Sequence, residues 1–369
     1  MQNPYNYNSP VRKTGDFFGR SSIIAKIYSR IGAERPQSVS LVGDPKIGKS
    51  SLLWYLAQPE TKKNFLNDHA NYVYFYIPVV DNGDLDFDNF SKIFWKIILT
   101  DIDKYLDLEE KTPSYDLFKK IVERLTQNQK KIILFFDDFH LTTRNESFPL
   151  EFFSFLRSLA NNYNLAFVTT SYLDLQQLCV SKEVEESPFF NIFTNLSLKP
   201  FEEKEAVQLI NEPSSKLGVN LLEHKERILK TANLFPYPLQ LVCHLLFEMK
   251  NNQHQISDTD LENLENTFYG RAENYFENIW SIFDEEQKFV LKEVLSSKKI
   301  KNTHQFVLND LIRRNLLQLD DSKVEFVLPH FQRFVTLKLG LKWKKTPGKN
   351  GFFKLIRKLF LRENKSQNH

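Results

Sequence analysis

The eight residues from Gly43 to Ser50 contain two glycines five positions apart, and a lysine and a serine directly follow the second. This spacing is the phosphate-binding P-loop, in which backbone N–H groups surround phosphate oxygens. We expect Lys49 to reach the β- and γ-phosphates and to serve catalysis, and Ser50 to ligate Mg²⁺. The residues expected around the nucleotide are Gly43, Asp44, Pro45, Lys46, Ile47, Gly48, Lys49, Ser50 and Ser51. The alternative is a glycine turn with a stray Lys-Ser pair.

Two acids follow an apolar run, Asp137 and Asp138, and the first lies 88 positions after Lys49. Open α/β sheets place ligand-binding groups at the carboxyl ends of their strands. We therefore expect Asp137 to hold Mg²⁺, usually through water. We expect Asp138 to be the catalytic residue that orients or deprotonates the attacking water. A pair of solvated loop acids is the alternative.

Other polar side chains are weaker candidates for the same site. Thr170 and Ser171 end the next apolar run. The alternatives for them are sensing of the γ-phosphate, positioning of water, and no role beyond that of ordinary strand-end hydroxyls. Arg144 and Arg157 follow the acid pair, either as an arginine finger or as surface arginines.

The elements that must position these residues alternate along the first 200 residues. Short apolar or β-branched runs are separated by helical patterns, which is typical of a parallel sheet with helices on both faces. The expected strands are 38–42, 72–80, 132–136, 165–171 and 193–198.

The pattern becomes helical from about residue 201, and 284–338 reads as a winged helix. Asp284 and Gln287 resemble a capping box at its start. Arg313 and Arg314 are its candidate DNA contacts, although a packing or autoinhibitory module is favoured. The expected divisions are a flexible leader 1–16, a P-loop NTPase α/β domain 17–200, a helical lid 201–256, a long helix plus winged helix 257–340, and a basic amphipathic tail 341–369.

Composition predicts a soluble cytoplasmic protein. Apolar residues make up 41% of the chain, yet no apolar run approaches the roughly 20 residues of a membrane span. The beginning of the chain lacks the apolar core of a signal peptide. Cys179 and Cys243 fit no metal or disulfide spacing, so we expect buried thiols in a reducing compartment.

The charge is unevenly distributed. Residues 341–369 contain nine Lys or Arg and one acid, which gives +8; the whole chain is +3, so the rest is −5. From Phe352 the tail has an apolar face opposite a basic one, as a membrane-surface or partner-binding helix does. The alternatives are packing on the winged helix, binding to a membrane surface or protein partner, and binding to nucleic acid.

Four segments together resemble the STAND and archaeal-type ATPases, a branch allied to the AAA+ proteins. They are the F-x-G-R opening at 17–20, the P-loop with Ser-Leu-Leu at 43–53, the hhhhDD acids at 132–138, and the P-Y-x-x-Q stretch within 234–240. The resemblance covers about 15–340, and its P-loop and acid motifs are the most specific parts.

The resemblance implies a switch that holds nucleotide between the sheet domain and the winged helix, then opens and oligomerises. It implies that Arg20 lies near the base and that Pro236 approaches the nucleotide from the lid. Two departures predict slow hydrolysis: Tyr172 stands where the family often has arginine, and Leu234 stands where it has glycine.

Three functions follow. The favoured one is an ATP-binding regulatory switch with Mg²⁺, which assembles into a homo-oligomer on binding ATP and works with a protein effector or sensor in signalling or defence. The second is a DNA-associated AAA+-like ATPase. The third is a nucleotide-binding scaffold with little hydrolysis. ATP is favoured over GTP because no base-reading N-K-x-D motif follows the fourth strand.

Overall fold

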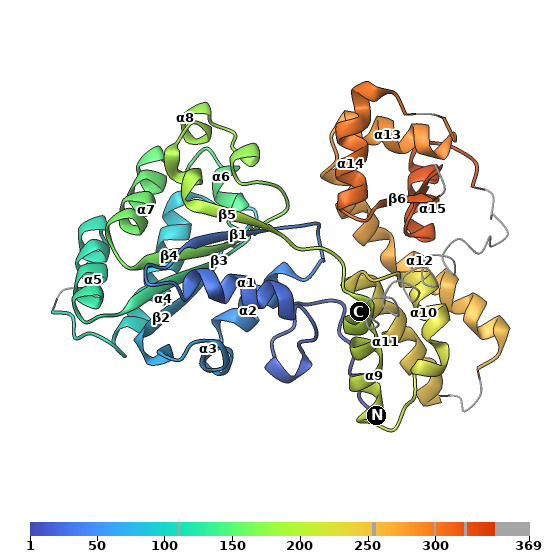
Figure 1. Ribbon diagram of the computed structural model, residues 1–369, viewed down its shortest axis with the longest axis horizontal. Coiled ribbons are helices and arrows are strands. Elements are labelled where there is room, and N and C mark those ends of the chain that lie inside the picture. The colour runs from blue at the N-terminus through green and yellow to red at the C-terminus, as the bar shows by residue number, and fades with distance from the viewer. Residues whose placement is uncertain (110, 253–255, 299, 321–322, 344–369) are drawn as a thin grey trace, which may run out of the picture. The chain divides into compact units, whose positions relative to one another are not determined.

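The structure, a computed structural model, describes residues 1–369 apart from 110, 253–255, 299, 321–322 and 344–369 (Figure 1). The chain divides into two compact units. One contains Asn8–Phe201, and the other contains Met1–Tyr7 together with the chain from Glu202 onward.

Five parallel strands form the sheet of the first unit, in the order β2-β3-β4-β1-β5. The strands are β1 Ser38–Val42, β2 Tyr72–Pro78, β3 Lys131–Asp137, β4 Leu165–Ser171 and β5 Phe193–Ser197. The central strands read as unbroken apolar runs because both faces of the sheet are covered. The predicted P-loop NTPase fold with a parallel sheet is confirmed.

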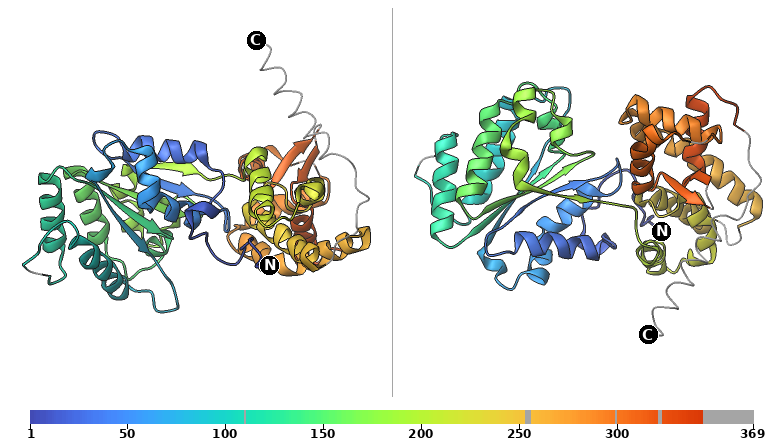
Figure 2. Two further views of the ribbon diagram at one scale, coloured as in Figure 1. Left: turned by 90° about the horizontal axis from the view of Figure 1, so that it is seen from below. Right: turned by 45° about the horizontal axis from the view of Figure 1, so that its top comes forward.

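Helices surround this sheet on both faces (Figures 1 and 2). They are α1 Ser21–Ile31, α2 Lys49–Ala57, α3 Pro59–Phe65, α4 Phe87–Ile102, α5 Tyr115–Gln127, α6 His140–Thr143, α7 Leu150–Asn162 and α8 Lys182–Glu185.

The two faces of edge strand β2 differ in chemistry. Val73, Phe75 and Ile77 point into a phenylalanine-rich core shared with β3, β4, α4, α5 and α7. The alternating residues Tyr72 and Tyr74, and Tyr76 beyond them, face the other way, because successive side chains of a strand point to opposite faces. A row of tyrosines therefore lies on the side of the sheet that also carries α2.

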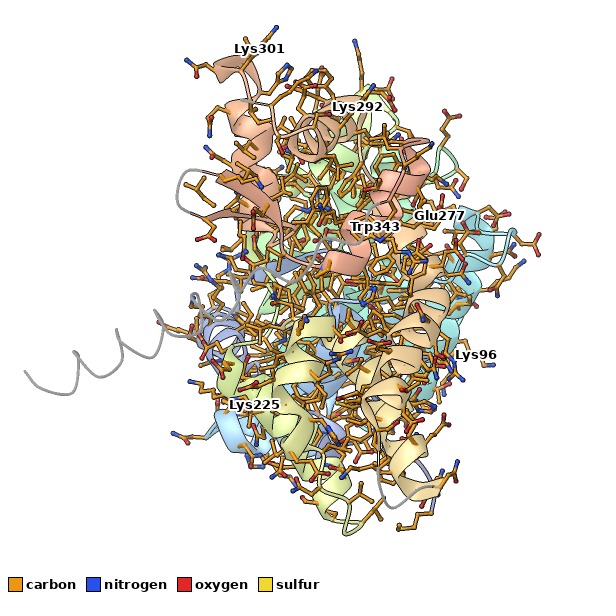
Figure 3. All side chains as sticks on the ribbon, turned by 90° about the vertical axis from the view of Figure 1, so that its right-hand side faces the viewer. Lys96, Lys225, Glu277, Lys292, Lys301 and Trp343 are labelled. Carbon is orange, nitrogen blue, oxygen red and sulfur yellow. The ribbon has the colours of Figure 1, made fainter. Side chains whose placement is uncertain are left out.

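Among its described residues, the second unit is helical apart from one hairpin, as predicted. Its helices are α9 Glu203–Ser215, α10 Lys225–Ala232, α11 Pro236–Asn252, α12 Asp258–Ser281, α13 Glu285–Leu295, α14 Gln305–Arg313 and α15 Pro329–Lys338. Strands β6 Leu317–Asp320 and β7 Lys323–Phe326 pair antiparallel. Lys338, which ends α15, forms an ion pair at 2.7 Å with Glu277 of α12. Glu277 is labelled in Figure 3.

The segment predicted as a winged helix contains its elements in the expected order. The Asp284–Gln287 capping box is present at the start of α13. Both arginines proposed as DNA contacts are paired with Asp310, from Arg313 at 2.6 Å and from Arg314 at 3.6 Å. Arg314 also lies over the ring of Phe283. These ion pairs do not test the DNA hypothesis, because the side chain of Arg313 is still 65% exposed.

The start of the chain differs from the flexible leader predicted for 1–16. Tyr5 is 2% exposed, and its hydroxyl donates to the carbonyl of Ile210. The side chain of Asn3 donates to the carbonyl of His244, whose ring nitrogen contacts the carbonyl of Tyr5 at 2.8 Å. Burial of the Tyr5 ring and these hydrogen bonds attach residues 1–7 to the helices of the second unit.

The predicted basic tail, 341–369, lies outside the described residues beyond Trp343. Its helix and its possible contacts therefore stay predictions. Within the described part of the chain, no helix combines the length and the apolar character that crossing a membrane requires.

Candidate nucleotide-binding site

The P-loop connects β1 to α2, and its two glycines are needed for different reasons. Gly48 has φ +98°, a conformation that favours glycine, and a Cβ there would meet nothing within 4 Å. A Cβ on Gly43 would lie 2.8 Å from the carbonyl oxygen of Leu198. Gly48 therefore leaves open space for a phosphate, whereas Gly43 allows close packing against the segment after β5.

Lys49 begins α2 and is 8% exposed. Its Nζ donates to the carbonyls of Gly43 and Asp44, at 2.7 Å and 3.0 Å. Burial lowers the pKa of Lys49, and the carboxylates of Asp138, Asp44 and Asp137 oppose this shift. The predicted lysine and the two predicted acids thus lie close enough to interact, at the end of the sheet where the P-loop emerges.

The other predicted P-loop residues lie around this lysine. Lys46 has a left-handed backbone at φ +61°. Ile47 is buried, and its N–H donates to the carbonyl of Asp44 at 3.3 Å. Ser51, in the first turn of α2, accepts a hydrogen bond from the N–H of Val11 at 3.0 Å. The hydroxyl hydrogen of Ser51 is thereby left to donate to a phosphate.

Asp137 ends β3, and hydrogen bonds fix both oxygens of its carboxylate. The hydroxyl of Thr170 donates to Oδ1 at 2.8 Å, and the hydroxyl of Tyr76 donates to Oδ2 at 2.7 Å. The N–H of Asp138 donates to the same Thr170 hydroxyl at 2.7 Å. Thr170 is therefore a positioning residue for both acids, a use that the sequence left open.

Sequence reasoning missed Tyr76 and Arg12. The guanidinium of Arg12 donates to the Tyr76 hydroxyl at 3.1 Å and lies 5.4 Å from its ring centroid. Burial and the charge of Asp137 raise the pKa of Tyr76, so its hydroxyl stays protonated and donates to Asp137. The alternation of tyrosines along 72–76 was the available signal for a polar face on this strand.

Asp138 has a left-handed backbone at φ +55° directly after β3. Its side chain is 44% exposed, which leaves room for water or phosphate on one side. Burial of the carboxyl on its other sides, and then the charge of Asp137, raise the pKa of Asp138 to about 6, against the opposing effect of Lys49. This carboxyl is therefore ionised at neutral pH and close to its titration point.

His140 lies beside Asp138 but is not its ion-pair partner. The two side chains are 4.0 Å apart, between Nδ1 and Oδ1. Burial, together with the charges of Lys49 and Arg144, lowers the pKa of His140 to about 4. The imidazole is neutral above pH 5 and does not contribute a charge change near pH 6.

These two shifts predict the pH dependence of hydrolysis. Water activation by Asp138 needs the carboxylate, so kcat/KM for Mg·ATP, which reports the pKa of the free protein, should fall about tenfold between pH 7.5 and pH 5. An aspartate with its ordinary pKa would give a constant rate over that range. A rate that stays constant down to pH 5, in protein whose circular dichroism is unchanged, would contradict this role for Asp138.

Arg20 is 7% exposed and precedes α1 with a left-handed backbone. Its guanidinium donates to the carbonyl of Ile47 at 2.9 Å and to the carbonyl of Lys199, and it lies 4.4 Å from the ring centroid of Phe201. Arg20 therefore connects the P-loop to the last residues of the first unit. Its place near the base stays a prediction, as does the approach of Pro236, which begins α11.

The two candidate arginine fingers have different surroundings. Arg144 is exposed, and it donates to the hydroxyl of Tyr172 at 2.8 Å. Tyr172 therefore places a guanidinium beside the end of β4, where family members often carry an arginine of their own. Arg157 lies within α7, and its Nε is buried without a hydrogen-bond partner among the described residues. Neither contact tests the finger role.

The donor set fits Mg²⁺. Mg²⁺ prefers oxygen ligands and keeps several waters, and it is usually bound by one or two carboxylates together with substrate phosphates. Ser50 offers a hydroxyl in the first turn of α2, and Asp137 offers carboxylate oxygens at the end of β3. Each Asp137 oxygen accepts one hydrogen bond and has a further lone pair for a metal-bound water.

The sequence matches the model of a known protein family. The model of the family described as Novel STAND NTPase 2 matches residues 33–299. No curated protein matches the sequence.

The solved structures that share the fold include two archaeal proteins. The Walker-type ATPase of Pyrococcus abyssi superposes with a TM-score of 0.61 at 15% identity, over 89% of this chain and 98% of that one. The ORC2 protein of Aeropyrum pernix, in its ADPNP and ADP complexes, gives 0.56 at 12% identity, over 92% and 98%. At these identities the likeness concerns the fold alone.

Proposed function

Because this chain belongs to the Novel STAND NTPase 2 family, we propose that it is a regulatory ATPase. It binds ATP with Mg²⁺, hydrolyses it slowly, and couples the nucleotide state to a change of conformation and to assembly with further copies of itself. The observation that carries this proposal is the buried Lys49 among the carboxylates of Asp44, Asp137 and Asp138, at a loop with open space beside Gly48.

Nucleotide binding follows from the partners of Lys49. Its Nζ donates to two backbone carbonyls, and phosphate oxygens are stronger acceptors because charge-assisted hydrogen bonds are roughly twice as strong as neutral ones. Lys49 therefore exchanges these carbonyls for phosphate. The N-terminal turn of α2 adds its N–H groups and its partial positive charge. Ser50 and Asp137 would hold Mg²⁺, which would offset negative charge on the phosphates.

Hydrolysis then depends on Asp138. Thr170 accepts the N–H of Asp138 and so fixes the backbone that carries this carboxylate. The ionised carboxylate accepts a proton from water or orients the water for attack on the γ-phosphate. Slow turnover is expected because Tyr172 stands directly after β4, where the resemblance implies an arginine. An arginine finger, where an enzyme has one, contributes about 10³- to 10⁵-fold in rate.

Arg20 gives the nucleotide a route to the rest of the chain. Its guanidinium bonds to Ile47 within the P-loop and to Lys199, two residues before the first unit ends at Phe201. A phosphate that shifts the P-loop backbone must therefore shift or strain the segment leading to the second unit. We propose that this segment transmits the difference between ATP and ADP, with Pro236 approaching the nucleotide in one of the two states.

Measurement of molecular mass by light scattering tests the switch. The Asp138→Asn variant, loaded with Mg·ATP, is expected to run as an assembly of at least two copies, and with Mg·ADP as a single copy. Equal mass and equal hydrodynamic radius in both states would contradict the proposal. This experiment does not test three further parts of the proposal. They are a cytoplasmic location, a protein effector in signalling or defence, and membrane or nucleic-acid contacts through 341–369.

A further inference from the structure

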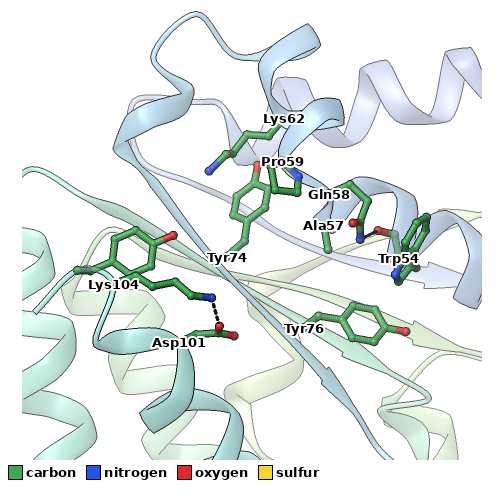
Figure 4. Close-up of a pocket in the computed structure, with 10 residues that line it drawn as sticks. Trp54, Ala57, Gln58, Pro59, Lys62, Tyr74, Tyr76, Asp101 and Lys104 are labelled. Carbon is green, nitrogen blue, oxygen red and sulfur yellow. Dashed lines mark hydrogen bonds and ion pairs between the residues drawn. The ribbon is translucent and has the colours of Figure 1, made fainter. Parts of the chain in front are cut away.

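A cavity of about 270 Å³ lies beside edge strand β2, apart from the P-loop (Figure 4). The C-terminal half of α2, the start of α3, the tyrosine face of β2 and the end of α4 line it, and one side is open to solvent. Its lining residues are Trp54, Ala57, Gln58, Pro59, Lys62, Tyr74, Tyr76, Asp101, Lys104 and Tyr105. Four of these ten side chains are aromatic, so flat rings form much of the wall.

The charge of this cavity is positive. Asp101 and Lys104 form an ion pair and cancel each other. Lys62 remains: its Nζ lies 4.8 Å from the ring centroid of Tyr74 and donates one hydrogen bond, to the carbonyl of Tyr72. Burial lowers the pKa of Lys62, as do the charges of Lys130 and Lys63, which shows that further cations lie near it. Lys62 has no carboxylate partner among the described residues.

The cavity is also rich in hydrogen-bond donors. Two of the three Lys62 protons, the indole N–H of Trp54 and the hydroxyl of Tyr105 have no acceptor among the residues that the structure describes. These donors would bind a ligand that offers oxygen acceptors, and the Lys62 ammonium beside them favours a ligand with negative charge. The aromatic rings favour a flat ligand that stacks on their faces or packs against their edges.

We propose that this cavity binds a small planar anion, that is, a flat ring carrying a carboxylate, sulfonate or phosphate group. The anionic group bonds to Lys62, and the ring lies among Trp54, Tyr74 and Tyr105. Because Tyr76 forms part of the wall and also donates to Asp137, the ligand is coupled to the proposed metal site.

The probe that tests the cavity is naphthalene-2-sulfonate, followed by isothermal titration of the full chain without nucleotide. A ligand of this size is expected to bind with a Kd of about 1 mM. Sulfate alone and 2-naphthol alone, which each carry half of the chemistry, should bind at least about tenfold more weakly. No saturable binding of the probe below about 10 mM, or equal binding of either half, would overturn the proposal.

Paired variants locate the binding. Lys62→Gln should raise the Kd of the probe about tenfold, whereas Lys63→Gln, its exposed neighbour, should leave the Kd unchanged. Tyr105→Ala should weaken binding, with the similarly exposed Tyr115→Ala as its control. Tyr105 follows α4 and lies outside the core, so this variant keeps the test valid if Lys62→Gln lowers stability. Unchanged binding in both Lys62→Gln and Tyr105→Ala would place the probe elsewhere.

A separate titration tests the coupling. The probe and Mg·ADP should change each other's Kd by the same factor, because linkage is reciprocal. Tyr76→Phe keeps the ring in the cavity wall and removes the hydroxyl that reaches Asp137, so it should bring that factor close to one. A factor of one in the unaltered protein would overturn the coupling. Failure of Mg·ADP to bind at all would instead contradict the proposed ATPase, and the probe titration without nucleotide would stand unaffected.

Discussion

Lys49→Ala is expected to raise the Kd for Mg·ATP by about 100-fold, because a hydrogen-bonded charge at a buried site is removed. The change also leaves Asp44, Asp137 and Asp138 without the cation that offsets their negative charge beside the phosphates. Repulsion between these carboxylates and the nucleotide then adds to the lost hydrogen bonds. Fluorescence titration with a labelled ATP analogue measures the effect directly.

The control for Lys49→Ala is Lys26→Ala, which removes an exposed lysine from α1. Both variants lose one positive charge, so a general electrostatic effect on the nucleotide would appear in both. We expect only Lys49→Ala to lose affinity. If Lys49→Ala binds Mg·ATP as tightly as the unaltered chain, the P-loop is not the nucleotide site and the proposed function is wrong.

Asp138→Asn is expected to slow phosphate release by about 10²- to 10⁴-fold, the usual contribution of a positioned general base. Affinity for Mg·ATP should change little, because Ser50, Lys49 and Asp137 are retained. Asparagine is suited to this position, since Asp138 has a left-handed backbone that asparagine also adopts readily. Single-turnover phosphate release with protein in excess over ATP separates the chemical step from product release.

The stability of Asp138→Asn provides the control. The pKa of Asp138 is raised in the folded chain, so the folded state binds more protons than the unfolded state between about pH 4 and pH 6. The free energy of unfolding therefore falls as pH rises through that window, and the ionised carboxylate disfavours folding above it. At pH 7.5 the neutral asparagine should leave the protein at least as stable. Phosphate release that is equally low in this variant and in the unaltered chain would favour the nucleotide-binding scaffold.

The sheet and the P-loop could be predicted because their signals are local. A strand buried on both faces is apolar over its whole length, as 132–136 is, and the P-loop needs a fixed set of residues within eight positions. The acids were placed by the same reasoning, since they directly follow an apolar run. Local patterns of this kind hold whatever the rest of the chain does.

The contacts that complete the site join distant positions, and no local pattern reports them. Tyr76 and Asp137 are 61 residues apart in sequence, and they meet only because β2 pairs with β3 in one register. Arg12 reaches Tyr76 from a segment without helical or strand periodicity. The attachment of residues 1–7 could not be predicted, because Tyr5 is a single buried aromatic residue among polar ones and forms no periodic hydrophobic pattern.

The contacts of residues 1–7 have a consequence for proteolytic cleavage of the chain between its two units. The backbone passes from one unit to the other twice, at residues 7–8 and again at 201–202. Cleavage at 201–202 alone produces two fragments, 1–201 and 202–369. Asn3 and Tyr5 of the first fragment still form hydrogen bonds with the second. The two pieces are therefore expected to stay associated after the cut, until the contacts of residues 1–7 are also broken.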